Sequence, residues 1–164
     1  MLDTVDRQIL MLLQEDGRMP NKEIAERIGM VPSATSERLR KLKERGIIIR
    51  IEARLDPEKV GRPLVAFIFV RTNEKAGGWN AGDQLAKIPQ VQEVYNVAGE
   101  DCYLVKIRTR DTHTLNELLR TRIGGIDAVQ STRTTIVMQS YKETCAIPLE
   151  EETILNYGQV KQRS

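Results

Sequence analysis

The hydrophobic period of the chain changes once, at Gly46. Before it, apolar residues recur at helical spacing, as Val5, Ile9, Leu12 and Leu13 do along one face. After it, apolar and polar residues alternate, which is typical of strands with one buried face. The sequence therefore predicts an α+β chain with a helical first part and a strand-rich second part.

The helical part contains the start and stop signals of three helices. We expect Asp3 to cap the first helix, which Gly17 follows, and Asn21 to cap a short second one. After the turn sequence GMVPS, Ser33 is the expected cap of a third helix that ends at Gly46. Three helices whose last two are joined by a short glycine-containing turn predict a helix-turn-helix.

The segment IIIRIEARLD follows the third helix and alternates apolar with charged residues from Ile49 to Leu55. This pattern predicts a strand, which would be the wing of a winged helix-turn-helix domain spanning 1–55. Pro57, Gly61 and Pro63 then predict a hinge over 56–63.

Beyond the hinge, strands and helices are expected in the order β-α-β-β-α-β. The predicted elements are strand 64–72, helix 77–87, strand 91–98, strand 102–109, helix 112–123 and strand 127–139. This order predicts a ferredoxin-like domain over 64–142, in which two helices cover one face of a four-stranded antiparallel sheet.

The other face of such a sheet needs a partner. Because the AFIFV stretch of the first strand is apolar on both faces, we expect self-association to bury it. The tail, 143–164, has one short apolar stretch from Ile147 to Leu149, which could add an edge strand.

Composition excludes several classes of protein. The apolar runs are far shorter than the roughly 18 residues of a membrane-spanning helix, so we expect a cytoplasmic protein. Cys102 and Cys145 stand far apart without a CxxC pattern and are expected to be reduced. His113 is the only histidine, which argues against a metal centre or a histidine-activated nucleophile. We assign no catalytic residue, metal or cofactor.

Positive charge is concentrated in the third helix and the segment after it. Residues 36–56 carry a net charge of +3, against +2 for the whole chain. Because the major groove of DNA admits one helix, we predict that this helix contacts double-stranded DNA. The proposed contacts from the residues themselves are Ser33, Thr35, Ser36, Arg38, Arg40, Lys41, Arg50 and Arg54. The alternative is a solvated helix face supported by Glu37–Lys41 and Arg40–Glu44 pairs.

The stretch from Leu2 to Gly61, together with VAGEDCYLVKIRTRD and IDAVQSTRTTIV, resembles the Lrp/AsnC, or feast/famine, transcription regulators. The resemblance implies a winged helix-turn-helix joined to a ferredoxin-like effector module, the RAM domain. It also implies homodimers that assemble further, often to octamers, and a response to an amino acid. Arg18 lies at a basic position that recurs in the family and joins the proposed DNA contacts.

The resemblance places the small-molecule site between dimers, at a turn formed here by Gly99, Glu100, Asp101, Cys102 and Tyr103. Glycine can expose backbone amides to a carboxylate, and an acid can receive an ammonium group. Many members have Asp where this chain has Cys102, so either Asp101 takes over or effector recognition is altered. Gly99 also suits a plain hairpin turn.

The last strand adds Thr132, Thr134 and Thr135, which are expected to line the same cleft. The alternative is that threonines simply favour strands.

We therefore expect a sequence-specific DNA-binding transcriptional regulator of the Lrp/AsnC type, modulated by an amino acid or a related small molecule. One alternative is an architectural protein that wraps DNA without an effector. The other is an enzyme similar to the siroheme decarboxylases, which resemble this family but use histidines that this chain lacks apart from His113.

Overall fold

The computed structural model describes residues 2–75, 78 and 80–149, and the chain divides into two compact units. Unit 1 consists of Met1–Ala53 together with Thr144–Ser164, and unit 2 is Arg54–Glu143. Each unit has its own hydrophobic cluster. Within the described residues, no helix combines the length and apolar character needed to span a membrane.

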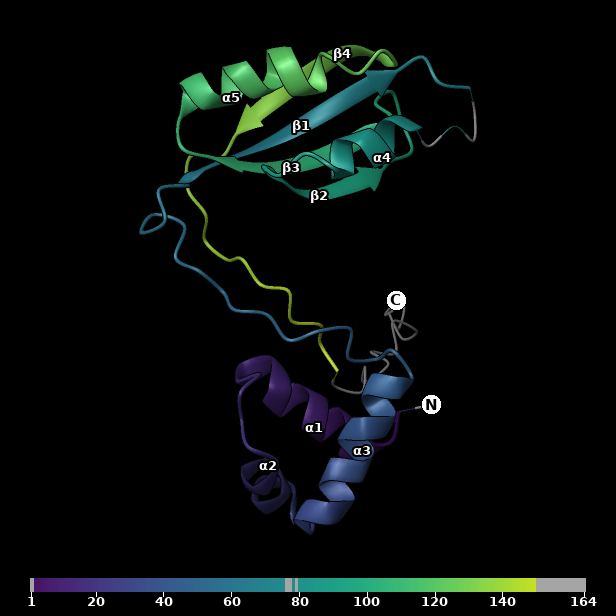
Figure 1. The fold of residues 1–164 in the computed structure, drawn as a ribbon, viewed down its shortest axis with the longest axis vertical. Coiled ribbons are helices and arrows are strands. Elements are labelled where there is room, and N and C mark those ends of the chain that lie inside the picture. The colour runs from purple at the N-terminus through teal and green to yellow at the C-terminus, as the bar shows by residue number, and fades with distance from the viewer. Residues whose placement is uncertain (1, 76–77, 79, 150–164) are drawn as a thin grey trace, which may run out of the picture. The chain divides into compact units, whose positions relative to one another are not determined.

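Unit 1 is the predicted helix-turn-helix. Its helices are α1 (Thr4–Glu15), α2 (Asn21–Ile28) and α3 (Pro32–Glu44), which pack against one another in Figure 1. Their apolar faces meet in a cluster that consists of Ile9, Leu10, Met19, Ile24, Leu39 and Leu42. Gly29, with φ of 71°, ends α2 in the left-handed conformation that lets the chain turn into α3.

One of the three predicted helix caps is confirmed. The Asp3 carboxylate accepts a hydrogen bond from the Asp6 backbone N–H at 2.7 Å. The predictions for Asn21 and Ser33 are wrong, because α2 begins at Asn21 itself and α3 begins one residue earlier, at Pro32. Proline suits the first helical position, since the N–H that it lacks would have no partner inside the helix.

Arg38 ties α3 to the start of α1. Its guanidinium donates to Asp3 Oδ2 at 2.6 Å and to Asp6 Oδ1 at 2.8 Å. Asp6 is buried, so its carboxylate depends on this contact for a charged partner. The other oxygen of Asp3 caps α1, so one carboxylate both starts a helix and holds its neighbour.

The predicted wing strand over 47–55 is wrong for the single chain. Residues 49–56 form neither a helix nor a strand, and Ile49 is 88% exposed. A strand requires a neighbour to receive its backbone hydrogen bonds, and an alternating pattern does not supply one. The described part of unit 1 contains helices but no strand.

The C-terminal segment returns to the helices of unit 1. The Gln14 side-chain amide donates to the Ile147 carbonyl at 3.0 Å and accepts from the Ile147 N–H at 2.6 Å. Leu149 packs against the hydrophobic cluster. The predicted edge strand at 147–149 is therefore wrong, since this stretch packs against the helices of unit 1. The rest of the tail, 150–164, lies outside the described residues.

Unit 2 has the predicted ferredoxin-like fold. Its elements are β1 (Leu64–Thr72), α4 (Asn80–Ala86), β2 (Val91–Asn96), β3 (Tyr103–Thr109), α5 (Thr112–Leu118), a π-helical turn η1 (Leu119–Ile123) and β4 (Val129–Ile136). The sheet has the order β2-β3-β1-β4, with every neighbouring pair antiparallel. The predicted helix at 77–87 starts later, at Asn80; residues 77 and 79 lie outside the described part.

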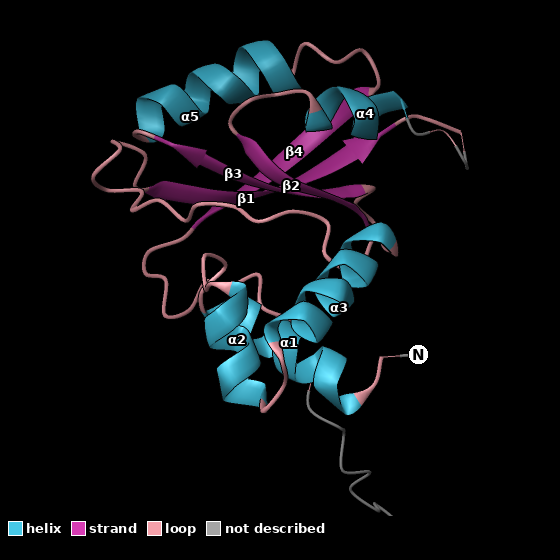
Figure 2. Ribbon diagram, turned by 60° about the horizontal axis from the view of Figure 1, so that its bottom comes forward, coloured by secondary structure: helices cyan, strands magenta, loops and turns pink. Residues whose placement is uncertain are grey.

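The two faces of the sheet differ. Figure 2 shows α4 and α5 on one face, where Ala66, Ile68 and Val70 of β1 are fully buried. Phe67 and Phe69 alternate with them and lie on the opposite face, which we call the open face. No helix among the described residues of unit 2 covers it.

Removing the Arg38 side chain should loosen unit 1. We expect Arg38→Ala to destabilise it by about 1–2 kcal/mol, because the buried Asp6 carboxylate would lose its charged partner. Hydrogen exchange measured on peptides from residues 2–45 should become faster. Arg27→Ala is the matched control, since Arg27 pairs with Glu23 at 2.7 Å on the surface of α2. Equal exchange in the two variants would contradict a positioning role for Arg38.

Candidate nucleic-acid interface and ligand turn

One face of α3 carries the polar residues that could meet DNA. Thr35, Leu39 and Leu42 point inward and are buried. The exposed face, which we call the α3 stripe, contains Ser33, Ser36, Glu37, Arg40, Lys41 and Glu44. These positions recur every three or four residues, so they lie along a single side of the helix.

Two of the DNA contacts predicted within α3 do not lie on this stripe. Thr35 is fully buried and its hydroxyl donates to the Val31 carbonyl at 3.3 Å, so it leaves the proposed interface. Arg38 is held by Asp3 and Asp6, which gives it a positioning role within unit 1. The sequence could not show this, because both aspartates lie more than thirty residues away from Arg38.

The cations of the stripe are paired with carboxylates of the same helix. Arg40 donates to Glu37 at 2.6 and 2.9 Å and also contacts Glu44. Lys41 lies 3.4 Å from Glu37. The hydrogen bond and charge of Arg40 lower the pKa of Glu37 to about 2, and its two carboxylate partners raise the pKa of Arg40. Glu37 is thus ionised at neutral pH, and the stripe is largely neutralised in the free chain.

The start of α3 is small and polar. Ser33 is exposed in the first turn, and the Ser36 hydroxyl accepts from the Asn21 side-chain amide at 3.1 Å. This bond connects the first residue of α2 to the outer face of α3. Short hydroxyl side chains at a helix N-terminus allow close approach of another backbone and can donate to it.

The remaining predicted DNA contacts are exposed, but elsewhere. Arg18 lies in the turn between α1 and α2, where its backbone N–H donates to Asp16 at 2.8 Å. Arg50 pairs with Glu52 at 2.5 Å in the extended segment. Arg54 is exposed at the first residue of unit 2.

The turn between β2 and β3 contains the predicted effector residues. Gly99 has φ of 140°, a conformation that favours glycine. The Glu100 carbonyl accepts from Arg71 Nε at 3.0 Å, and Asp101 Oδ2 accepts from Arg133 Nη2 at 3.0 Å. Arg133 also lies over the Phe69 ring, 3.9 Å from its centre. Arginines from β1 and β4 therefore hold this turn.

Cys102 and Tyr103 point away from the exposed part of the turn. The Cys102 sulfur accepts from the Thr72 N–H at 3.4 Å. Tyr103 is buried and its hydroxyl donates to Glu74 Oε2 at 3.2 Å. Burial and the Glu74 charge raise the pKa of Tyr103. Of the two acids in the turn, Asp101 is thus the one that a cation, Arg133, holds in place. Cys102 instead contacts the backbone of Thr72.

The three threonines of β4 do not share one cleft. In the register of the sheet, Thr132 pairs with Val70 and Thr134 with Ile68, so both point to the helix-covered side. Thr135 faces Phe67 on the open face. Period-two alternation makes this separation unavoidable for neighbouring residues, so the prediction that they line one cleft together is wrong.

Arg71 and Arg133 were not predicted as site residues. Both lie in predicted strands, and strict alternation places both on the open face, opposite the buried residues. The position of the turn over that face is a tertiary feature, and the sequence pattern does not contain it.

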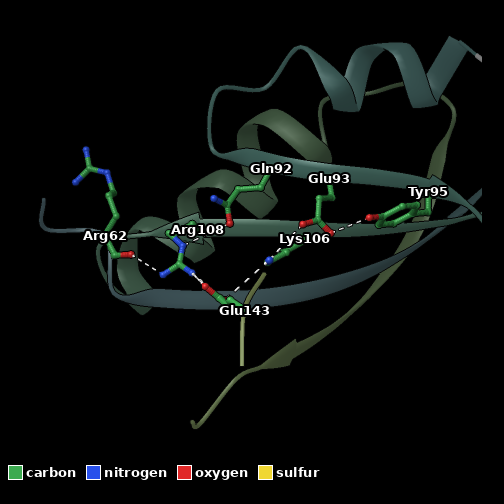
Figure 3. A network of polar contacts seen from close by, with 7 residues as sticks. All are labelled: Arg62, Gln92, Glu93, Tyr95, Lys106, Arg108 and Glu143. Atoms are coloured by element: carbon green, nitrogen blue, oxygen red, sulfur yellow. Dashed lines mark hydrogen bonds and ion pairs between the residues drawn. The ribbon is translucent and has the colours of Figure 1, made fainter. Parts of the chain in front are cut away.

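The open face carries half-buried charges, all from unit 2. Figure 3 shows Lys106 and Arg108 of β3 next to Glu143, which follows β4. Arg108 donates to both oxygens of Glu143 at 2.8 and 3.0 Å, and Lys106 donates to Glu93 at 3.3 Å. Tyr95 donates to the same glutamate at 2.9 Å. Lys106 and Arg108 thus each have a carboxylate partner from their own chain.

Two family models match the chain. A winged helix-turn-helix DNA-binding model matches residues 2–49, and the Lrp/AsnC ligand binding domain matches residues 65–147. Together they cover the helices of unit 1 and all of the sheet of unit 2 except its first residue, Leu64.

Known proteins are similar over nearly the full chain. The HTH-type transcriptional regulator FL11 of Pyrococcus horikoshii is 41% identical over 91% of this chain and 97% of its own. The leucine-responsive regulatory protein of Salmonella typhimurium is 35% identical, over 87% and 88%. Among solved structures, transcriptional regulator NMB0573 of Neisseria meningitidis in complex with L-Met superimposes with a TM-score of 0.86, at 31% identity, covering 91% of this chain and 97% of that one.

The matched models and these relatives agree with a chain that contains both a helix-turn-helix unit and a βαββαβ unit. The chain belongs to the Lrp/AsnC family of DNA-binding transcriptional regulators.

Proposed function

We propose that this regulator inserts the α3 stripe into the major groove of an operator as a homodimer or larger assembly, and that an amino acid bound at the 99–103 turn modulates it. The observation that carries the DNA part is the stripe itself: one side of α3 is anchored by Leu39 and Leu42, and the other presents Ser33, Ser36, Arg40 and Lys41. We place its action in the cytoplasm, where its bacterial and archaeal relatives meet DNA.

DNA binding would exchange one set of anions for another. In the free chain Glu37 and Glu44 neutralise Arg40. A phosphate or a guanine edge can replace these carboxylates, because a guanidinium binds both with the same fork of donors. Glu37 and Glu44 then repel nearby phosphates. Only a groove whose base edges and phosphates align with the cations of the stripe offsets this repulsion. This arrangement favours selective binding over uniform wrapping, which is the architectural alternative.

The open face supports self-association. Phe67 and Phe69 lie there half-buried, and Lys106 and Arg108 are already paired with Glu93 and Glu143. A second copy can therefore cover Phe67 together with Lys106 and Arg108 without leaving these two cations unpaired. The 49–55 segment also has exposed apolar side chains. Pairing with the same segment of a second chain would make it a strand and bury these side chains.

An amino-acid effector is supported by the relatives and by the turn. The Neisseria regulator was solved with L-Met, and its fold matches 91% of this chain. The turn here presents a glycine with positive φ beside an aspartate and an arginine, which together suit a zwitterion. Such a ligand acts only if it binds two assembly states unequally. We propose a binding role without a covalent reaction, in line with relatives that are named as regulators.

The stripe can be tested by changing its charges one at a time. On a duplex selected from a random pool, Arg40→Gln should weaken binding about tenfold. It should also reduce the slope of log K against log salt concentration by about one, because one phosphate contact is lost. Glu37→Gln should strengthen binding several-fold, because it removes a carboxylate that competes with phosphate. Fluorescence anisotropy at fixed salt measures both. The control is Arg120→Gln, on the exposed side of η1; effects equal to this control would exclude the stripe.

A charge in the middle of the open face should break the assembly. Phe67 lies between Lys106 and Thr135 in the sheet. We expect Phe67→Glu to shift the protein to a smaller species in sedimentation velocity, since the interface would bury an additional carboxylate next to a Lys106 that Glu93 already neutralises. Asn116→Glu, on the exposed side of α5, is the control. An unchanged sedimentation coefficient for Phe67→Glu would place self-association on another surface.

The effector response can be tested by thermal shift with each of the twenty amino acids. A ligand that binds only the folded state raises the Tm. At least one amino acid should raise the Tm of the wild type, and Gly99→Val should lose that shift because a branched residue cannot adopt φ of 140° without strain. A shift preserved in Gly99→Val would move the ligand site away from the turn.

A further inference from the structure

Arg108 contacts both segments that connect unit 2 to unit 1. The chain leaves unit 1 after Ala53 and returns to it after Glu143, so the two units are connected twice. Within unit 2, Arg108 of β3 donates to the Arg62 carbonyl at 3.4 Å and to both carboxylate oxygens of Glu143 at 2.8 and 3.0 Å (Figure 3). Arg62 lies just before β1, and Glu143 is the last residue of the unit. One side chain therefore holds both connections at their unit 2 ends.

These contacts of Arg108 are largely shielded from solvent. The Arg108 side chain is 14% exposed and that of Glu143 is 29% exposed. The third nitrogen, Nε, donates to Gln92 Oε1 at 3.4 Å, so each nitrogen of the guanidinium has an acceptor. Salt screens such a pair less than a surface pair, and removing one partner leaves the other charge poorly solvated. We refer to the contacts with Arg62 and Glu143 as the Arg108 contacts.

In unit 1, the same two segments are held at the end of α1. The Ile51 side chain lies against Gly17, so closely that a Cβ atom at position 17 would come within 2.7 Å of Ile51 Cγ2. Gln14 exchanges two hydrogen bonds with the backbone of Ile147, at 2.6 and 3.0 Å. Ile51 precedes the first crossing between the units, and Ile147 follows the second. Each connection is therefore bound in both units.

The second connection is much shorter than the first. Ile147 follows Glu143 by four residues, and a chain of that length spans at most about 14 Å. Arg62 follows Ile51 by eleven residues, which can span up to about 40 Å. Residues 143–147, which we call the tail linker, therefore restrict the movement of unit 1 more tightly than the first connection does. They do so only while both of their ends are bound.

We infer that Arg108 is a positioning residue for DNA binding. By holding both connections, the Arg108 contacts limit how freely each helix-turn-helix moves within an assembly. Two helix-turn-helix units that are restricted in this way lose less freedom when they bind two half-sites of one operator, so the effective concentration at the second half-site is higher. Binding at a single half-site gains nothing, because the Arg108 contacts lie in unit 2. The inference rests on the proposed use of α3 by a homodimer or larger assembly.

The test uses the full chain and a duplex with two half-sites that is selected from a random pool, together with the same duplex reduced to one half-site. In further duplexes, the spacing between the half-sites is varied over one helical turn, about 10 bp. Fluorescence anisotropy measures the Kd of wild type, Arg108→Gln, Glu143→Gln, Gln14→Ala and the double variant of Glu143→Gln with Gln14→Ala. Arg110→Gln is the matched control, since Arg110 lies two residues from Arg108 and forms an exposed pair with Asp111 at 3.0 Å.

The three single variants should each bind the two-site duplex about tenfold more weakly and the one-site duplex as tightly as the wild type. They should also tolerate changes in spacing that weaken the wild type. Because Gln14 and Glu143 hold opposite ends of the tail linker, the double variant should lose no more affinity than the weaker single variant, whereas independent sites would give additive losses.

Circular dichroism and sedimentation velocity check that the variants fold and assemble. Gln14→Ala tests the tail linker even where a change at Arg108 or Glu143 disturbs assembly, because Gln14 is an exposed residue of α1.

Equal losses on the one-site and two-site duplexes, or a spacing preference that all variants share with Arg110→Gln, would overturn the inference. If Arg40→Gln still weakens binding in that case, the proposed function stands without it. If the wild type selects no duplex from the pool, the proposed function fails and the inference fails with it.

Discussion

The contact of Arg38 with Asp3 and Asp6 determines which side of α3 faces outward. Asp3 uses one oxygen to cap α1 and the other to bind Arg38, and buried Asp6 completes the site. Leu39 and Leu42 enter the hydrophobic cluster next to this contact. With α3 fixed at both its apolar and its charged inner positions, Ser33, Ser36, Arg40 and Lys41 remain together on the solvent side. The DNA-binding proposal depends on that fixed orientation.

Both proposed binding surfaces share one physical feature. The cation that would bind the ligand is paired, in the free chain, with a carboxylate of the same unit: Arg40 with Glu37, and Arg133 with Asp101. Binding would therefore exchange partners and not simply add a contact. Such an exchange weakens the attraction of these arginines for anions in general. It favours a ligand whose anionic group takes the place of the internal carboxylate with the same geometry. It accounts for a DNA-binding chain with a net charge of only +2.

Alternation and helical spacing predicted most of the fold. β1 occupies the predicted residues 64–72, and the sheet has the ferredoxin-like order. The pattern failed where a partner decides the outcome. Residues 49–55 alternate but have no neighbouring strand among the described residues. Thr35 is a polar residue, yet it is buried and its hydroxyl donates to the Val31 carbonyl. The partners of Arg38 and Arg133 are remote in the chain, so only the packed structure brings them together.

The most direct measurement is a structure of the protein bound to a duplex selected from a random pool. The account predicts that the α3 stripe lies in the major groove, that Arg40 has left Glu37 for a base edge or a phosphate, and that Arg38 still binds Asp3 and Asp6. A complex in which Arg38 has swung onto the DNA, or in which the stripe faces away from the groove, would contradict it.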